Sequence, residues 1–324
     1  MSAGISTPDG PIQRPYPTAN RRNLYLYILP LIVGPMLILV SAFFILPSSW
    51  FALQPSAPGL TGIGYGARLK NADCQIVFYG DSSAEVGITP ALVRQSTGLS
   101  VCNIAEPEGM TVLNDTLIVD QYLQHNKPPR YLVFLFTPED LAPHSSKEHH
   151  ELFEAITYRM RQPHKLANIF FVLQHPEDGF KWAYVGMNLA IRHAFSKPFP
   201  PEIVEMRERH EGRFISPDPP LKACVGTHDT APDKPWIQSL RSRYNRNGTT
   251  VLVDSMPLPV CDRSLAFFQK ELPGITDNPV ATFPMNVYLI GGRHVNSTGS
   301  ILLSKMLSDQ IIQKMHSDPI TGGR

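Results

Sequence analysis

A serine in a turn and a histidine in a distant loop are the residues of this sequence whose types suit nucleophilic chemistry. Ser82 follows a short apolar run, and His294 precedes an apolar-periodic segment over residues 301–315. A serine hydroxyl and an imidazole base are the minimum for nucleophilic catalysis, and such partners meet in space rather than along the chain. The alternatives are a plain polar turn over residues 80–83 and a solvated loop histidine.

The residues before Ser82 indicate a position that suits this chemistry. Residues 75–79 are apolar, β-branched or aromatic, which predicts a buried strand. Gly80 ends the run, since glycine tolerates positive φ. In an open α/β sheet ligands bind at the carboxyl ends of the strands, where turn amides can stabilise a developing oxyanion. We therefore expect Ser82 to face a crevice.

A similar prediction applies to His294. A strand expected over residues 286–290 would deliver the histidine to the same edge of the sheet. Asn296, Ser297 or Thr298 is expected to cap the helix that follows.

The rest of the domain alternates between strands and helices, which favours a doubly wound α/β fold with a parallel sheet. Further strands are expected over residues 100–105, 130–136 and 249–254, and helices over residues 89–96, 111–125, 234–247, 264–272 and 301–315. Residues 144–220 interrupt this rhythm. They read as a helical insertion with helices over 151–161 and 182–195 and a proline-rich loop over 199–220. We expect the insertion to flank the mouth of the site and to contact a membrane or a partner.

Composition excludes several classes of function. The 324 residues hold 29 Lys plus Arg and 28 Asp plus Glu, so the net charge of +1 predicts no nucleic-acid partner. Seven histidines lie within residues 144–220, but His149 and His150 would point to different helix faces and no H-E-x-x-H motif occurs. We expect neither a metal site nor a cofactor.

The four cysteines leave two readings open. Their spacing contains no C-x-x-C pair, so a zinc site is not expected. Pairing Cys74 with Cys102 and Cys224 with Cys261 is the simplest disulfide pattern, since each bond closes a local loop. Four buried thiols are the alternative. Disulfides would fit a domain that lies outside the cytoplasm.

The N-terminal part of the chain predicts a membrane anchor. We expect a cytoplasmic tail over residues 1–22, a transmembrane helix over 23–47, a linker over 48–68 and an extracytoplasmic domain over 69–318. The apolar core, residues 24–46, is long enough to cross a hydrocarbon layer of about 30 Å. Arginines precede it and the next Lys or Arg is Arg68, which predicts a cytoplasmic N-terminus. A cleaved signal peptide is the alternative.

Three short islands carry a resemblance to a known family. Residues 80–83, 103–109 and 294–299 resemble the first, second and last sequence blocks of the SGNH/GDSL hydrolase superfamily. More narrowly, they look like its membrane-anchored, extracytoplasmic acyl-transfer branch. The resemblance implies a flavodoxin-like three-layer α/β/α fold, with Ser82 as nucleophile and His294 as general base. It also implies an oxyanion hole formed by the amides of Ser82 and Gly109 and by an asparagine side chain.

Two positions depart from the family pattern. Glu139 stands where the third block usually has asparagine, and a carboxylate repels an oxyanion unless it is protonated or turned away. Gly291 stands three residues before His294, where the family usually has its acid. The pair is therefore expected to act as a dyad or to receive an acid such as Asp277 from elsewhere. Asp81 is a further possible accessory residue.

The combined reading predicts a serine-dependent O-acyltransferase or esterase acting on a cell-surface glycan. The resemblance implies a partner, a multi-pass membrane-bound O-acyltransferase or glycan-assembly machinery that supplies the acyl group. A non-catalytic accessory subunit of an envelope polysaccharide complex is the second hypothesis, favoured by Gly291 and Glu139. A secreted lipase released by cleavage of the N-terminal segment is the third.

Overall fold

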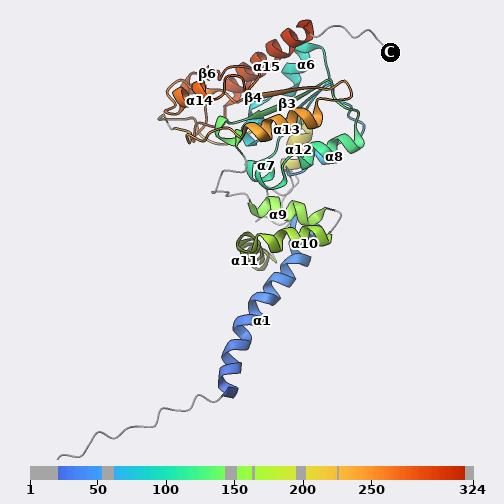
Figure 1. The fold of residues 1–324 in the computed structure, drawn as a ribbon, viewed down its shortest axis with the longest axis vertical. Helices are drawn as coiled ribbons and strands as arrows, with labels where there is room; N and C mark the ends of the chain where they lie inside the picture. The colour runs from blue at the N-terminus through green and yellow to red at the C-terminus, as the bar shows by residue number, and fades with distance from the viewer. Residues whose placement is uncertain are drawn as a thin grey trace, which may run out of the picture.

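The structure is a computed structural model in which an α/β domain, a layer of helices and one long projecting helix follow each other along the longest axis (Figure 1). It describes residues 21–52, 62–142, 152–162, 165–194, 202–224 and 226–317. Residues 1–20 of the predicted tail, residues 53–61 of the predicted linker, and His149 and His150 lie outside the described residues.

A parallel sheet of four strands forms the centre of the α/β domain, as the sequence predicts. The strands are β1 (Ile76–Gly80), β2 (Val101–Asn103), β3 (Tyr131–Phe136) and β4 (Thr250–Ser255), in the spatial order β2-β1-β3-β4. In register, Val77 lies opposite Cys102 and Leu132. Both faces of β1 and β3 are buried, so these strands are apolar without alternation.

Helices cover both faces of the sheet, so the domain has three layers. One face carries Val77 and Phe134 and packs against α8 (Leu117–His125) and α13 (Lys234–Tyr244). The other carries Phe78 and Val133 and packs against α6 (Pro90–Thr97) and α15 (Ser297–Ser317). The predicted α/β class is confirmed.

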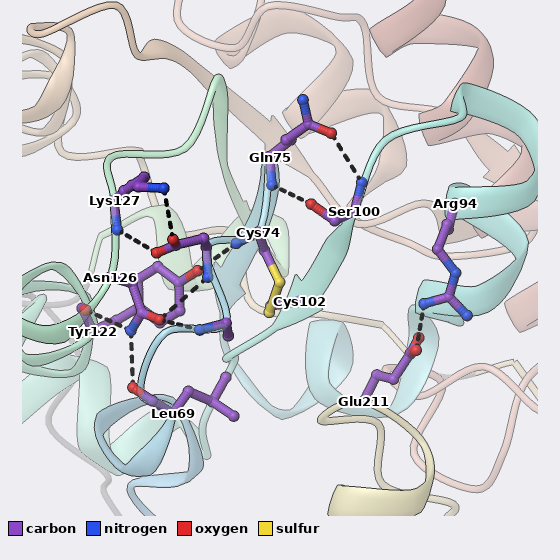
Figure 2. Close-up of a disulfide and its surroundings, with 12 residues drawn as sticks. Leu69, Cys74, Gln75, Arg94, Ser100, Cys102, Tyr122, Asn126, Lys127 and Glu211 are labelled. Atoms are coloured by element: carbon purple, nitrogen blue, oxygen red, sulfur yellow. Dashed lines mark hydrogen bonds and ion pairs between the residues drawn. A yellow bond between two sulfur atoms is a disulfide. The ribbon is translucent and has the colours of Figure 1, made fainter.

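Both cysteine pairs of the simplest pattern form disulfides. Cys74 bonds to Cys102 and so ties the entry of β1 to β2 (Figure 2). The hydroxyl of Tyr122 on α8 accepts a hydrogen bond of 3.0 Å from the Cys74 amide (Figure 2). Cys224 bonds to Cys261. The described residues contain no free cysteine, so the alternative of four thiols is wrong.

The helix expected over residues 111–125 is instead two helices, α7 (Glu108–Asn114) and α8. Asp115 breaks them with a positive φ of 48°. Its carbonyl accepts a hydrogen bond from the Tyr79 hydroxyl at 2.7 Å, and its carboxylate accepts one from the Trp236 indole at 2.9 Å. Because these partners lie on β1 and α13, the break is fixed by tertiary contacts that helical periodicity does not reveal.

The segment before His294 is the second difference. Residues 286–290, expected to form a strand, contain the 3-10 helix η2 (Met285–Val287) followed by single antiparallel bridges. The remaining described elements are α2 (Ser49–Ala52), α4 (Tyr65–Arg68), α5 (Ser82–Gly87), η1 (Pro138–Leu141), β5 (Leu258–Pro259), α14 (Leu265–Glu271) and β6 (Thr282–Phe283).

The helix α1 (Arg21–Ile45) projects from the molecule (Figure 1). Over Tyr25–Ile45 its mean hydropathy is 2.6 and most of its surface is exposed, so it is long and apolar enough to span a membrane. Residues 62–68, expected to belong to a free linker, instead pack into the domain: Ile63 and Tyr65 are buried.

The helical insertion is more helical than expected. It contains α9 (Leu152–Arg161), α10 (Lys165–Gln174), α11 (Pro176–His193) and α12 (Glu202–Arg209). Helix α12 lies inside the range expected to be a proline-rich loop. Its Arg207 is buried in the protein interior, where it pairs with Glu85 and Glu106, contacts between distant segments that local composition does not reveal.

Candidate active site

Ser82 and His294 lie in direct contact. The His294 Nε2 atom is 2.9 Å from the Ser82 Oγ atom, within the 2.6–3.2 Å over which a base takes up a proton. Both residues are half-buried. Although 212 positions separate them, the fold brings them together at the carboxyl edge of the sheet. The arrangement can move the hydroxyl proton to the imidazole and leave the oxygen free to attack an electrophile.

Asp81 fixes the backbone that carries Ser82. Its carboxylate caps α5 by accepting hydrogen bonds from the amides of Ser83 (2.8 Å) and Ala84 (3.3 Å). Its second oxygen accepts one from the Thr137 amide at 2.6 Å, beyond the end of β3. Gly80 is required just before it, since a Cβ atom there would lie 1.7 Å from the Leu135 carbonyl oxygen. Asp81, expected as an accessory residue, therefore holds β1, α5 and β3 together beneath the serine.

A hairpin-like loop delivers His294. The Leu289 amide donates to the His294 carbonyl at 2.8 Å, and the Asn296 amide donates to the Val287 carbonyl at 2.8 Å. Asn296 then caps α15, with its Oδ1 atom accepting a hydrogen bond from the Gly299 amide at 3.1 Å. The predicted cap is confirmed. Backbone hydrogen bonds on both sides of His294 hold the loop that carries the imidazole.

Burial controls the charge of His294. It lowers the pKa of the imidazole below its usual value of 6.5, while the negative charges of Asp81 and Asp218 act in the opposite direction and Arg293 adds to the lowering. The ring is therefore neutral at pH 7, the state in which a histidine accepts a proton. For Nε2 to accept the serine proton, the ring proton must sit on Nδ1.

Glu139 contacts this loop through Arg293. Its side chain is buried, forms an ion pair with Arg293 and accepts a hydrogen bond from the His228 amide at 2.7 Å. The positive charge of Arg293 offsets the negative charge of this buried carboxylate. Glu139 therefore holds the histidine loop in place.

Asp277, expected as a possible third catalytic residue, belongs to another part of the domain. Its carboxylate accepts hydrogen bonds from the Val253 amide at 2.7 Å and from Arg241 at 3.1 Å. These contacts tie its loop to the middle of β4. No contact with His294 occurs among the described residues, so Asp277 is not the orienting acid.

Asp218 is the carboxylate that inspection of the sequence missed. Pro220 forms an antiparallel bridge with Leu289, and the Ile290 amide donates to the Pro219 carbonyl at 2.8 Å. Two positions further, this register sets Asp218 opposite Gly291, the position three residues before His294. The Asp218 side chain is exposed and accepts a hydrogen bond from the Ser216 hydroxyl at 2.7 Å, so among the described residues it acts on His294 through its charge and not through a hydrogen bond to the ring. Proline flanks Asp218 on both sides, a pattern that indicates a rigid loop but no partner.

The expected oxyanion donors are only partly described. Among the described residues no hydrogen bond engages the Ser82 amide, which stands at the first position of α5. Gly109 lies in the first turn of α7. The role of its amide as an oxyanion donor stays a prediction. Asn103 of the second block is buried, and its amide group donates to the carbonyls of Ala84 (3.0 Å) and Glu85 (3.3 Å). These hydrogen bonds tie Asn103, at the end of β2, to the backbone of α5.

The two best-defined cavities lie elsewhere. The larger, of about 570 Å³, is lined by residues of α7, α8, α9 and α10, and the smaller, of about 210 Å³, by residues near Tyr244. Neither includes Ser82 or His294. Within the described ranges no group of three or more His, Cys, Asp or Glu side chains is arranged to bind a metal ion. The contact between Ser82 and His294, and not a cavity, therefore identifies the candidate active site.

Comparisons with known proteins give no further guide to function. No family model, curated protein or solved structure matches the chain.

Proposed function

We propose that this protein is an SGNH-like serine acyltransferase or esterase. The observation that carries the proposal is the 2.9 Å contact between the Ser82 hydroxyl and the His294 imidazole. It is supported by the lowered pKa of that imidazole and by the cap through which Asp81 fixes the serine backbone.

In the proposed reaction His294 Nε2 takes the Ser82 proton as the serine oxygen bonds to the acyl carbon. The bond between this carbon and the leaving group then breaks, and the leaving group receives the proton from His294. The Ser82 amide, with that of Gly109, would stabilise the oxyanion formed between these events. An acceptor hydroxyl or water, deprotonated by His294, releases the acyl group and restores the serine.

The proposed location is outside the cytoplasm, with α1 as a single membrane anchor. Two disulfides fit an oxidising compartment, and the arginines before α1 fit a cytoplasmic N-terminus. Anchoring favours transfer to a membrane-proximal glycan over diffusion to soluble esters. A multi-pass membrane O-acyltransferase that supplies the acyl group is the partner that the family resemblance implies.

A serine-directed fluorophosphonate probe tests the proposal. We expect it to label the full-length protein in detergent at Ser82, because His294 activates that hydroxyl. The matched control is Ser83→Ala, which removes the neighbouring buried hydroxyl and should leave labelling intact, whereas Ser82→Ala should eliminate it. Absence of labelling in a folded protein with both disulfides intact would contradict the enzyme.

That negative result would support a non-catalytic accessory subunit instead. One observation favours this second candidate: among the described residues, no carboxylate accepts a hydrogen bond from His294 Nδ1 in this conformation. The enzyme hypothesis therefore predicts that the charge of Asp218 affects catalysis through His294, and the accessory-subunit hypothesis predicts no catalysis to affect.

We expect Asp218→Asn to lower kcat by on the order of tenfold, since each 1.4 kcal/mol of lost transition-state stabilisation is tenfold in rate. Asp218 raises the pKa of His294, so its removal should lower that pKa further and move the acid limb of the pH profile to lower pH. Rate–pH profiles with a model ester would measure both effects. The matched control is Asp309→Asn on the exposed face of α15, and an unshifted profile for Asp218→Asn would exclude the role.

A further inference from the structure

Helix α10 exposes an apolar face to solvent. Leu166, Phe170 and Leu173 are 73%, 64% and 55% exposed. Their spacing of four and three residues sets them on one side of the helix. The opposite side packs on α9, where the Asn168 side chain donates to the Arg159 carbonyl at 2.9 Å. The apolar face is therefore directed away from α9.

Helix α11 repeats this pattern. Phe180, Tyr184 and Ile191 are more than half exposed, and the rings of Phe180 and Tyr184 stack with centroids 6.3 Å apart. The other side of α11 packs on the C-terminal end of α1, where Trp182 meets Phe43 with ring centroids 5.3 Å apart. Exposed aromatic and aliphatic side chains on two adjacent helices form a patch that a soluble surface rarely carries.

The position of the two helices identifies what covers this patch. Figure 1 shows α9, α10 and α11 as a layer between the α/β domain and α1, with α10 running across the direction of α1. At this layer the environment of α1 changes: Ala42, near its C-terminal end, is buried, whereas Leu37 is 61% exposed. The exposed apolar residues of α11 thus lie on a helix that packs directly against α1, which itself exposes apolar side chains.

We propose that α10 and α11 form an interfacial collar that lies on the bilayer, with its apolar side chains inserted at the boundary between headgroups and acyl chains. The inference rests on the membrane anchoring proposed above and not on acyl transfer. A lipid surface is favoured over a protein partner because α11 packs against the end of α1, the helix that itself enters lipid in the proposed anchoring. The exposed cation Arg192 on α11 suits a lipid phosphate and Tyr184 suits the interface, whereas Lys181 pairs with Glu177 at 2.8 Å.

Spin-label accessibility in lipid nanodiscs tests the collar in the full-length protein. The described cysteines are all in disulfides, so an introduced cysteine provides the free thiol for labelling. Labels at Phe170→Cys and Leu173→Cys should be accessible to oxygen, which partitions into lipid, and shielded from the water-soluble nickel chelate Ni-EDDA. We expect depths of about 5–10 Å, as for other interfacial helices. Ile301→Cys, an exposed apolar position on α15, is the matched control and should report water.

Leu37→Cys in α1 is the reference that separates this inference from the anchoring. If Leu37→Cys reports lipid while Phe170→Cys and Leu173→Cys match Ile301→Cys, the collar is overturned and the anchor stands. If Leu37→Cys reports water, both fail. Shielding of the collar labels from oxygen and Ni-EDDA alike would show a protein cover and overturn the lipid assignment. Labelling by the fluorophosphonate probe is unaffected by any of these outcomes.

Discussion

Ser82→Ala should lower acyl transfer to a model ester by at least about 10³-fold, because it removes the atom that forms the covalent intermediate. The hydroxyl makes its described hydrogen bond only to His294, and the α5 cap comes from Asp81. The substitution should therefore change the free energy of unfolding by less than about 0.5 kcal/mol, as for most substitutions that remove no packing. Ester hydrolysis and urea unfolding would measure the two quantities.

The histidine provides the matched comparison. His294→Ala alone should cost nearly as much activity as the Ser82→Ala, His294→Ala double variant, since the two groups act as one unit. Because burial lowers the pKa of His294, the midpoint of the acid limb of the wild-type pH–rate profile should lie below pH 6.5. Full activity in Ser82→Ala would refute the assignment.

Arg207→Met should destabilise the domain by about 3–5 kcal/mol, the usual result of leaving a buried charge without its partner. The Arg207 guanidinium is almost wholly buried and lies 3.1 Å from the Glu85 carboxylate and 3.5 Å from that of Glu106. It also donates to the Ala105 carbonyl at 2.7 Å. Methionine keeps much of the volume but leaves two buried carboxylates together. Urea unfolding of the full chain in detergent would measure the loss.

Arg209→Met is the matched control on the same helix. Arg209 is exposed and its ion pair with Glu205 is long, at 3.9 Å, so about 0–1 kcal/mol is expected. Glu85→Gln added to Arg207→Met should restore part of the lost stability by removing one unpaired charge. Equal effects of Arg207→Met and Arg209→Met would show that the buried network contributes nothing.

The buried network of Arg207, Glu85 and Glu106 also makes the free energy of unfolding depend on pH. Burial raises the pKa of Glu85 to about 7, above the unfolded value of about 4.3. The contribution of this carboxyl to stability is therefore full below about pH 4 and is lost as pH rises through 7. The difference in stability between the wild type and Glu85→Gln should therefore fall as pH rises from 4 to 8, and a difference that does not change over this range would contradict the prediction.

Local sequence was sufficient for elements whose stability comes from near neighbours. The apolar run ending at Gly80 and the Asn296 cap form as expected, and α1 has the length and composition of a membrane span. Local sequence was insufficient where contacts with residues far along the chain override the pattern that predicts a helix or a strand. Asp115 breaks a helix because Tyr79 and Trp236 bind it, and residues 285–290 bridge to the Pro219 segment rather than join the sheet.

The sequence by itself determined a serine at a strand end and a histidine before a helix, because strand, cap and turn preferences act over a few residues, whereas the choice between disulfides and free thiols needed the structure. Only the tertiary structure decided that these two side chains touch, that Asp218 and not Asp277 lies beside the histidine loop, and that Arg293 neutralises Glu139. Distances between segments far apart in the chain depend on how helices and strands pack, and residue spacing carries no record of that packing.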